Sequence, residues 1–107
     1  MIAIEQNISN QIKEVVKSFF PEAKVLLFGS RARGDYNKDS DYDLLIIVKD
    51  EIPDREKITL GGRINEKLVK TLHAPFDVLL NSEKEINIYK DLPGNIIRWA
   101  LKEGIIL

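Results

Sequence analysis

The chain has 107 residues, of which 44% are hydrophobic and 31% charged, with a formal net charge of −1 and no cysteine. This length suits one domain with its own core, so we expect a single domain over residues 1–107. The charge disfavours a broadly basic nucleic-acid binder, and the lack of cysteine excludes disulfides, thiolate metal sites and a cysteine nucleophile. The longest apolar run, Leu44 to Val48, is too short to cross a membrane, and Glu5 interrupts any signal-peptide core, so we expect a cytoplasmic protein.

The first half of the chain predicts one amphipathic helix and two buried strands. Residues 8–20 carry apolar side chains at helical spacing, with Asn7 or Ser9 as the N-cap and Pro21 just beyond the end. Residues 24–28 and 42–48 are apolar at consecutive positions, which predicts strands that are buried on both faces.

A longer helix and a third strand follow. Residues 54–72 are predicted to be helical, although Gly61-Gly62 lowers helix propensity and suggests a break or kink there. The core-facing residues of this helix are predicted to be Ile58, Ile64, Leu68 and Leu72. Residues 76–80 are predicted to form the third strand.

The last part of the chain predicts two short helices and an apolar tail. Ser82 and Glu85 have the spacing of a capping box. Residues 93–103 are predicted to form the final helix, with Gly104 at its C-cap and an apolar tail over residues 105–107. The core face of this helix is predicted to hold Ile96, Ile97, Ala100 and Leu101, and Trp99 and Phe19 are also predicted to be core residues. This order predicts a small α/β domain whose mixed sheet has at least three strands, with helices packed over one face.

The stretch 28–43 contains the side chains that indicate a function. If Asp41 and Asp43 begin a strand, both carboxylates project to the same side, where they repel each other unless a cation lies between them. Mg²⁺ prefers such ligands and keeps positions free for phosphates. Gly29 allows close approach of a ligand, Ser30 offers a hydroxyl, and a helical turn over residues 30–33 would favour a phosphate. This combination points to phosphoryl or nucleotidyl transfer.

The spacing of Gly29-Ser30 and the Asp41-x-Asp43 pair resembles the nucleotidyltransferases of the DNA polymerase β-like superfamily. The fuller string Gly-Ser-Arg-Ala-Arg-Gly, with Ser-Asp-x-Asp-Leu, resembles the small minimal nucleotidyltransferase branch. The resemblance implies a polymerase-β-like core and a third carboxylate on a later strand, for which Asp77 is the matching residue. It implies two Mg²⁺ ions held by Asp41, Asp43 and Asp77, with Asp77 also acting as general base toward the acceptor hydroxyl.

Other residues near the motif have less specific signals. We expect Arg31 or Arg33 to reach the triphosphate, the alternative being that one of them pairs with an acid such as Asp35. His73 is the only histidine, and a lone histidine is more often structural than catalytic. The acids from Asp35 onward superficially resemble an EF-hand loop, but the required glycine and glutamate are absent, which excludes that motif.

The function predicted from the sequence is Mg²⁺-dependent transfer of a nucleoside monophosphate, AMP from ATP, to a hydroxyl. Family resemblance implies a separately encoded helical partner of the HEPN type, with a tyrosine on that toxin as the acceptor. Another copy of the chain is the other candidate partner, since no acceptor-binding domain is recognisable. A non-catalytic antitoxin that only binds its partner is the alternative function, and modification of a small molecule is a third.

Overall fold

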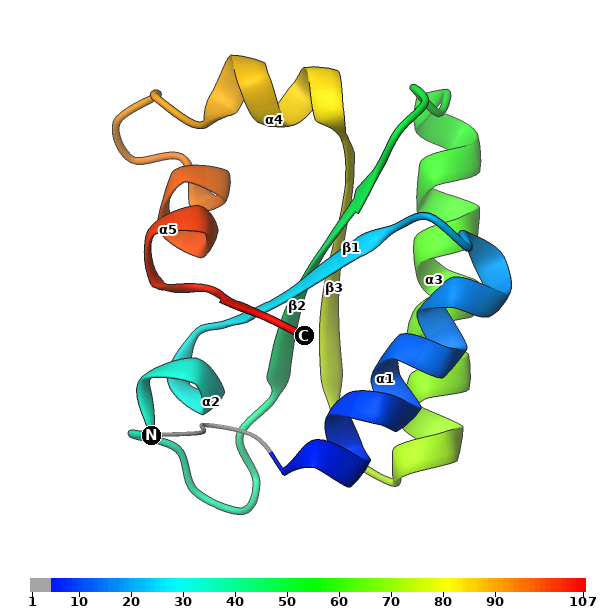
Figure 1. The fold of residues 1–107 in the computed structure, drawn as a ribbon, viewed down its shortest axis with the longest axis vertical. Coiled ribbons are helices and arrows are strands. Elements are labelled where there is room, and N and C mark those ends of the chain that lie inside the picture. Colours follow the sequence, from blue (N-terminus) through cyan, green and yellow to red (C-terminus); the bar gives the residue numbers. More distant parts are fainter. Residues whose placement is uncertain (1–4) are drawn as a thin grey trace.

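The computed structural model describes residues 5–107, in which helices and strands alternate along the chain (Figure 1). The elements are α1 (Gln6–Phe19), β1 (Lys24–Phe28), α2 (Ser30–Arg33), β2 (Tyr42–Val48), α3 (Asp54–Leu72), β3 (Phe76–Ser82), α4 (Glu83–Tyr89), α5 (Ile96–Glu103) and β4 (Ile105–Ile106). The strands predicted at 24–28 and 42–48 are confirmed at both boundaries, and the third strand extends two residues beyond the predicted Leu80.

The four strands form one mixed sheet in the order β3-β2-β1-β4. β1 runs antiparallel to both β2 and β4, while β2 runs parallel to β3. The apolar tail therefore forms an edge strand, and Leu107 continues it by donating its N–H to the carbonyl of Val25 at 2.9 Å. The mixed α/β sheet predicted from the sequence is confirmed.

Helices cover both faces of the sheet, so the prediction of helices over one face is wrong in this respect. On one face Ile12, Ile64 and Leu68 pack with Leu44 and Ile46. On the other, Ile97 and Ala100 pack with other strand side chains, among them Leu45 and Ile47. Figure 1 accordingly places α1 and α3 on one side of the sheet and α4 and α5 on the other. Consecutive apolar residues in a strand alternate between faces, and each face requires a cover.

Several helix details differ from the sequence predictions. α1 begins at Gln6 with Glu5 at its N-cap and no side-chain cap, while Ser9 is buried inside the helix, so neither Asn7 nor Ser9 is the cap. α5 begins three residues later than predicted, because the side chain of Asn95 accepts a hydrogen bond from the N–H of Ile97 and caps it there.

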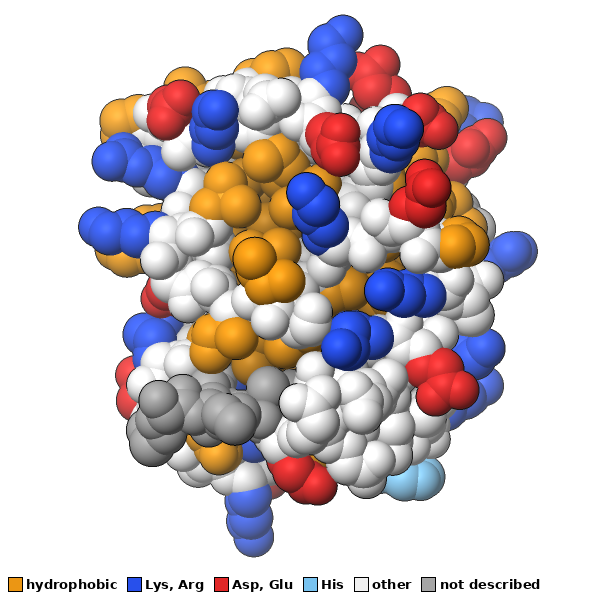
Figure 2. Space-filling model, in the orientation of Figure 1, with side chains coloured by type: hydrophobic (Ala, Val, Ile, Leu, Met, Phe, Trp, Pro, Cys, Tyr) orange, Lys and Arg blue, Asp and Glu red, His pale blue; other side chains and the backbone are white. Residues whose placement is uncertain are grey.

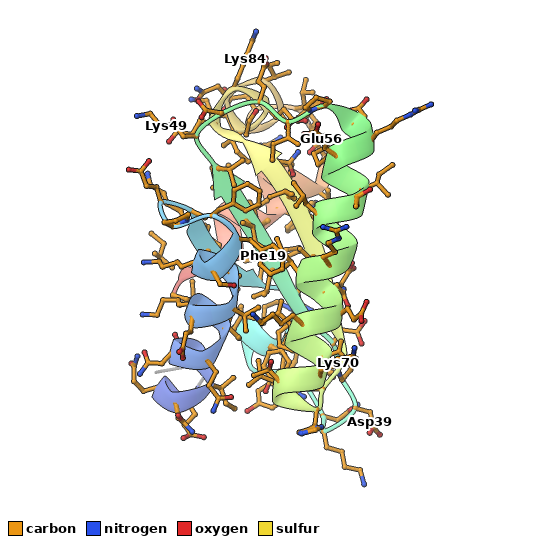
Figure 3. All side chains as sticks on the ribbon, turned by 90° about the vertical axis from the view of Figure 1, so that its right-hand side faces the viewer. Phe19, Asp39, Lys49, Glu56, Lys70 and Lys84 are labelled. Atoms are coloured by element: carbon orange, nitrogen blue, oxygen red, sulfur yellow. The ribbon has the colours of Figure 1, made fainter. Side chains whose placement is uncertain are left out.

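Three apolar residues predicted to be core are exposed. Ile58 is 77% exposed, Trp99 57% and Ile96 50%, so their helical spacing did not determine their environment. Phe19 is half-buried where α1 and α3 lie side by side (Figure 3).

The helices before and after β3 have defined ends next to the strand. α3 continues through Gly61-Gly62 without a break, so the suggested kink is absent, and it ends at His73, whose φ of 53° is left-handed. At the other end of the strand, the predicted capping box is confirmed, with Ser82 and Glu85 each accepting from the other's backbone N–H.

Acidic and basic side chains are interspersed around the face drawn in Figure 2, without a large area of one sign. Within residues 5–107, no helix is both long enough and apolar enough to cross a membrane.

Candidate active site

A sharp turn at Gly29 joins β1 to the single helical turn α2. Gly29 has a φ of 74°, a conformation that L side chains rarely adopt, and it is buried. A Cβ at this position would collide with the carboxylate of Asp43. The chain therefore needs glycine here both for its backbone conformation and for the close approach of an acid.

Asp43 and Asp77 lie side by side on neighbouring parallel strands. Asp43 of β2 is the register partner of Asp77 of β3, so both side chains project from the same face of the sheet. Asp41 lies two residues before Asp43, directly before β2. Asp43 is half-buried, while Asp41 and Asp77 are exposed at the rim. The three carboxylates that the sequence analysis selected thus belong to one end of the sheet.

The electrostatic environment of Asp43 disfavours its charged form. Its partial burial raises the pKa of Asp43 above the ordinary range, and the negative charges of Asp77 and Asp41 raise it further. The positive charge of Arg33 acts in the opposite direction. An acid in this position is stabilised as a carboxylate when a cation approaches it.

The donor set suits a hard cation. Carboxylate oxygens from two adjacent strands are the ligands that Mg²⁺ prefers, and Asp77 and Asp41 add negative charge beside the partly buried Asp43. Within residues 5–107, no group of three or more His, Cys, Asp or Glu side chains is already gathered closely enough to enclose an ion. Two acids can hold a cation whose other positions are taken by substrate oxygens and water.

The two arginines after the turn have different contacts. The guanidinium of Arg31 donates to the carbonyls of Ser40 at 3.1 Å and Lys38 at 3.4 Å, and it lies 4.4 Å from the ring centre of Tyr36 and 4.3 Å from that of Tyr42. Arg31 therefore fastens the loop that leads from α2 to β2.

Arg33 instead pairs with two acids. Its guanidinium lies 3.4 Å from Asp35 and 3.2 Å from Glu103, and these contacts, Glu103 first, raise the pKa of Arg33. Arg33 is thus the arginine that pairs with Asp35, an alternative that the sequence analysis left open.

Sequence reasoning missed Glu103 at the end of α5. Its carboxylate accepts a hydrogen bond from the N–H of Gly29 at 2.9 Å and also binds Arg33, although 74 residues separate it from Gly29. The following residue, Gly104, has no room for a Cβ, which would collide with the carbonyl of Ala100. A Glu-Gly pair that ends a helix before an apolar tail is the only local signal of this contact.

His73 and the aromatic residues have structural positions. His73 ends α3, where its N–H bonds to the carbonyl of Val69 at 2.8 Å. The rings of Tyr42 and Phe76 stack with centroids 5.1 Å apart, and these residues lie on the face of the sheet opposite to Asp43 and Asp77.

Comparison with known proteins points to one family. Residues 9–107 match the family model described as "Nucleotidyltransferase domain". The chain is also 32% identical over 82 residues to a protein of Methanocaldococcus jannaschii that is named "Putative protein adenylyltransferase", and the match covers 66% of this chain and 76% of that protein.

Solved structures share the fold. A toxin-antitoxin crystal structure with AMP-PNP superposes with a TM-score of 0.67 at 17% identity, covering 91% of this chain and 69% of that one. A Shewanella oneidensis structure of a tri-AMPylated HEPN toxin in complex with its MNT antitoxin superposes with a TM-score of 0.64 at 15% identity, covering 96% and 71% of the two chains. At these identities the likeness concerns the fold alone.

Proposed function

This chain belongs to the nucleotidyltransferase domain family, and we propose that it transfers AMP from ATP to a hydroxyl group of a protein acceptor. The observation that carries this proposal is the register of Asp43 with Asp77, beside a glycine turn that has no room for a side chain. An acidic pair next to an open backbone turn is typical of enzymes that bring a metal-bound triphosphate to a nucleophile.

The three acids have separate proposed roles. Asp41 and Asp43 would hold the cations, and Asp77 would complete the site and accept the proton of the acceptor hydroxyl as that oxygen attacks the α-phosphorus. The bond from the α-phosphorus to the bridging oxygen breaks, and pyrophosphate leaves. Bound Mg²⁺ would neutralise charge on the phosphates and polarise them.

Gly29 and Ser30 are proposed to lie against the triphosphate, the first through its backbone and the second through its hydroxyl. Of the two arginines, Arg33 is the better candidate for a phosphate contact. Its charge already acts on Asp43, and its present partners Asp35 and Glu103 are side chains that can exchange for a phosphate. Arg31 is engaged with backbone carbonyls of the loop.

Nucleotide binding can be tested on the isolated chain. Millimolar ATP with Mg²⁺ is expected to raise the melting temperature, because a ligand that binds only the folded state adds stability, and Asp43→Asn is expected to reduce that rise. The matched control is Asp39→Asn, which removes an exposed acid from the neighbouring loop. An unchanged melting temperature for the wild type would favour the non-catalytic antitoxin function instead.

The acceptor is proposed to be a tyrosine of a helical partner of the HEPN type. The tri-AMPylated HEPN toxin in the Shewanella oneidensis complex supports this proposal by analogy. Holding the acceptor in place can contribute roughly 7–11 kcal/mol to catalysis, so transfer to free tyrosine is expected to be slow. The test incubates the chain with ATP, Mg²⁺ and a recombinant HEPN protein, and intact mass spectrometry reads the gain of AMP. Efficient modification of a free small alcohol would contradict a protein acceptor.

A further inference from the structure

A groove of about 620 Å³ runs along the free edge of β3 and is lined on its other side by α3. Figure 1 shows this helix lying beside the strand. The strand side of the groove consists of the consecutive residues Asp77, Val78, Leu79, Leu80 and Asn81. Consecutive strand residues point to opposite faces, so a groove that touches all of them follows the edge of the backbone rather than either face. This groove begins at the third proposed catalytic acid.

The hydrogen bonds around β3 reveal which of its backbone groups point into the groove. The carbonyl of Pro75 accepts from Tyr42 of β2 at 3.0 Å, while the carbonyl of Phe76 points away from β2 and accepts from the side chain of Asn65 at 2.8 Å. Backbone groups alternate along a strand, so the N–H and C=O of Val78 and Leu80 also point away from β2. β3 is an edge strand of the sheet, so within the described residues no neighbouring strand lies on this side to pair with these four groups.

The helix side of the groove includes two adjacent positions without side chains, Gly61 and Gly62. A Cβ added at Gly61 or Gly62 would meet no other part of the molecule within 4 Å, and neither glycine has a left-handed φ. Each glycine costs about 1 kcal/mol of helix stability relative to alanine. Internal packing gives no reason for the pair, and Ile58, one turn before it, is 77% exposed. The absence of side chains at Gly61 and Gly62 leaves space in the groove for a polypeptide backbone beside β3.

The charges along the groove favour an uncharged backbone over a polyphosphate. Lys57 is held by Glu85 at 2.6 Å, and Glu66 by Lys70 at 2.8 Å. With these two pairs neutralised, Asp77 is the remaining charge among the lining residues of the groove. A nucleic-acid backbone would meet a carboxylate at the start of this groove and no unpaired cation among its lining residues, whereas peptide N–H and C=O groups would meet their complements on β3.

We propose that this groove binds the acceptor as an extended polypeptide segment that adds a strand to the free edge of β3. The segment bonds to the backbone of Val78 and Leu80 and runs past Gly61-Gly62. In such a pairing the side chain opposite Asp77 projects from the same face as Asp77 and Asp43. A hydroxyl side chain at that position faces the carboxylates. The reaction of this hydroxyl rests on the proposed function, but the docking itself does not.

The experiment measures docking without nucleotide, so that it succeeds or fails independently of AMP transfer. The probe is a short peptide of alternating threonine and valine around a central tyrosine, with lysine at both ends. Amide hydrogen exchange is followed by NMR as the peptide is added to the full chain. We expect exchange of the Val78 and Leu80 amides to slow by about tenfold or more at saturation, as new strand hydrogen bonds require. Unchanged exchange at these two amides, or no binding at millimolar peptide, would overturn the proposal.

Matched variants separate strand addition from other binding. Two peptides are compared, one N-methylated at its odd-numbered residues and one at its even-numbered residues. One of them should lose binding and the other should keep it, because only one of the two sets of N–H groups faces β3. Gly62→Gln fills the groove and should weaken binding by about tenfold, a loss of about 1.4 kcal/mol, whereas Thr59→Gln, on the neighbouring helix face, should leave it unchanged. Equal affinity of both variants would contradict the groove. Concentration-dependent protection without peptide, with the mass of a dimer, would assign the edge to a second copy instead.

Discussion

The two ends of β3 differ in how their charged side chains are arranged. At its end, Ser82 and Glu85 exchange capping hydrogen bonds, and Glu85 also binds Lys57 at 2.6 Å. Although partial burial opposes ionisation of Glu85, hydrogen bonds from Lys57 and Ser82 hold its pKa below the ordinary range. At the start of the strand, Asp77 lies beside Asp43, and the pKa of Asp43 is raised. Figure 3 separates the same two ends, with Lys84 near one and Asp39 near the other.

This difference indicates what each end is for. One end pairs the charges of Lys57 and Glu85 within the chain and stabilises the fold. The other gathers like charges at a cost in stability, which a bound cation and substrate would offset. The predictions below alter one end at a time, so that stability and activity separate.

The largest expected effect is that of Asp43→Asn on transfer. Loss of one carboxylate from the proposed cation site should reduce AMP transfer by about a hundredfold to a thousandfold, the size of effect seen when a charge-stabilising group is removed from other enzymes. The same substitution should stabilise the protein without metal at neutral pH, since it removes a partly buried charge and its repulsion with Asp77 and Asp41. Transfer assays and urea denaturation measure the two effects. Wild-type transfer by this variant would contradict the proposed site.

The pH dependence of this stabilisation has a definite sign. A carboxyl whose pKa is raised by folding stabilises the folded state while it is protonated, and this contribution disappears as the pH rises from the ordinary value of 3.8 through the folded value. The stability advantage of Asp43→Asn should therefore be largest at neutral pH and shrink on acidification toward that ordinary value.

Gly29→Ala should have the next largest effect. The substitution forces a left-handed φ on alanine and places its Cβ against Asp43, so we expect a loss of about 2 kcal/mol in the free energy of unfolding. Gly34→Ala is the matched control, because Gly34 has a φ of 92° but open space around it. Gly34→Ala should lower the free energy of unfolding only by the cost of the left-handed backbone, about 1 kcal/mol. Equal losses would show that contact with Asp43 contributes nothing.

Two substitutions of Glu103 test whether its hydrogen bond or its charge contributes more to stability at the active-site end. Glu103→Ala removes the acceptor of the Gly29 N–H and should cost about 1 kcal/mol. Glu103→Gln keeps an acceptor oxygen and should recover most of that loss, while it releases Arg33 from its ion pair. Thermal unfolding of both variants tests this order. If glutamine behaves like alanine, the charge rather than the hydrogen bond holds α5 to the turn.

The smallest expected effect lies at the stabilising end. Glu85→Gln keeps the capping geometry and loses the ion pair with Lys57, so we expect a loss of about 0.5 kcal/mol and unchanged transfer. Because the pKa of Glu85 is lowered by folding, its contribution is present above the ordinary value of 4.5 and disappears as the pH falls through the folded value. Denaturation of wild type and variant should therefore converge in acid.

Local sequence signals predicted the parts of the fold that local physics determines. The boundaries of β1 and β2 and the Ser82–Glu85 capping box follow from runs of apolar residues and from the spacing of two side chains. The motif around Asp41 and Asp43 could be assigned to a strand entrance for the same reason. These features depend on neighbours within a few residues.

The features that the sequence did not predict depend on distant partners. Ile58 and Trp99 have helical spacing that suits a core, but the helices turn these residues to the surface. Glu103 reaches Gly29 only because β4 returns the chain to the edge of β1 and brings the end of α5 with it. The packing of α5 on the second face of the sheet depends on the same pairing of β4 with β1.

The contact between Gly29 and Asp43 also constrains how this protein can evolve. A side chain at position 29 would collide with the carboxylate of Asp43, so replacing the glycine costs more stability while that acid is present. A lineage that has lost Asp43 is relieved of this collision, although the left-handed backbone still favours glycine at position 29. Among descendants of a common ancestor, replacements of Gly29 should therefore occur mainly in sequences that also lack Asp43.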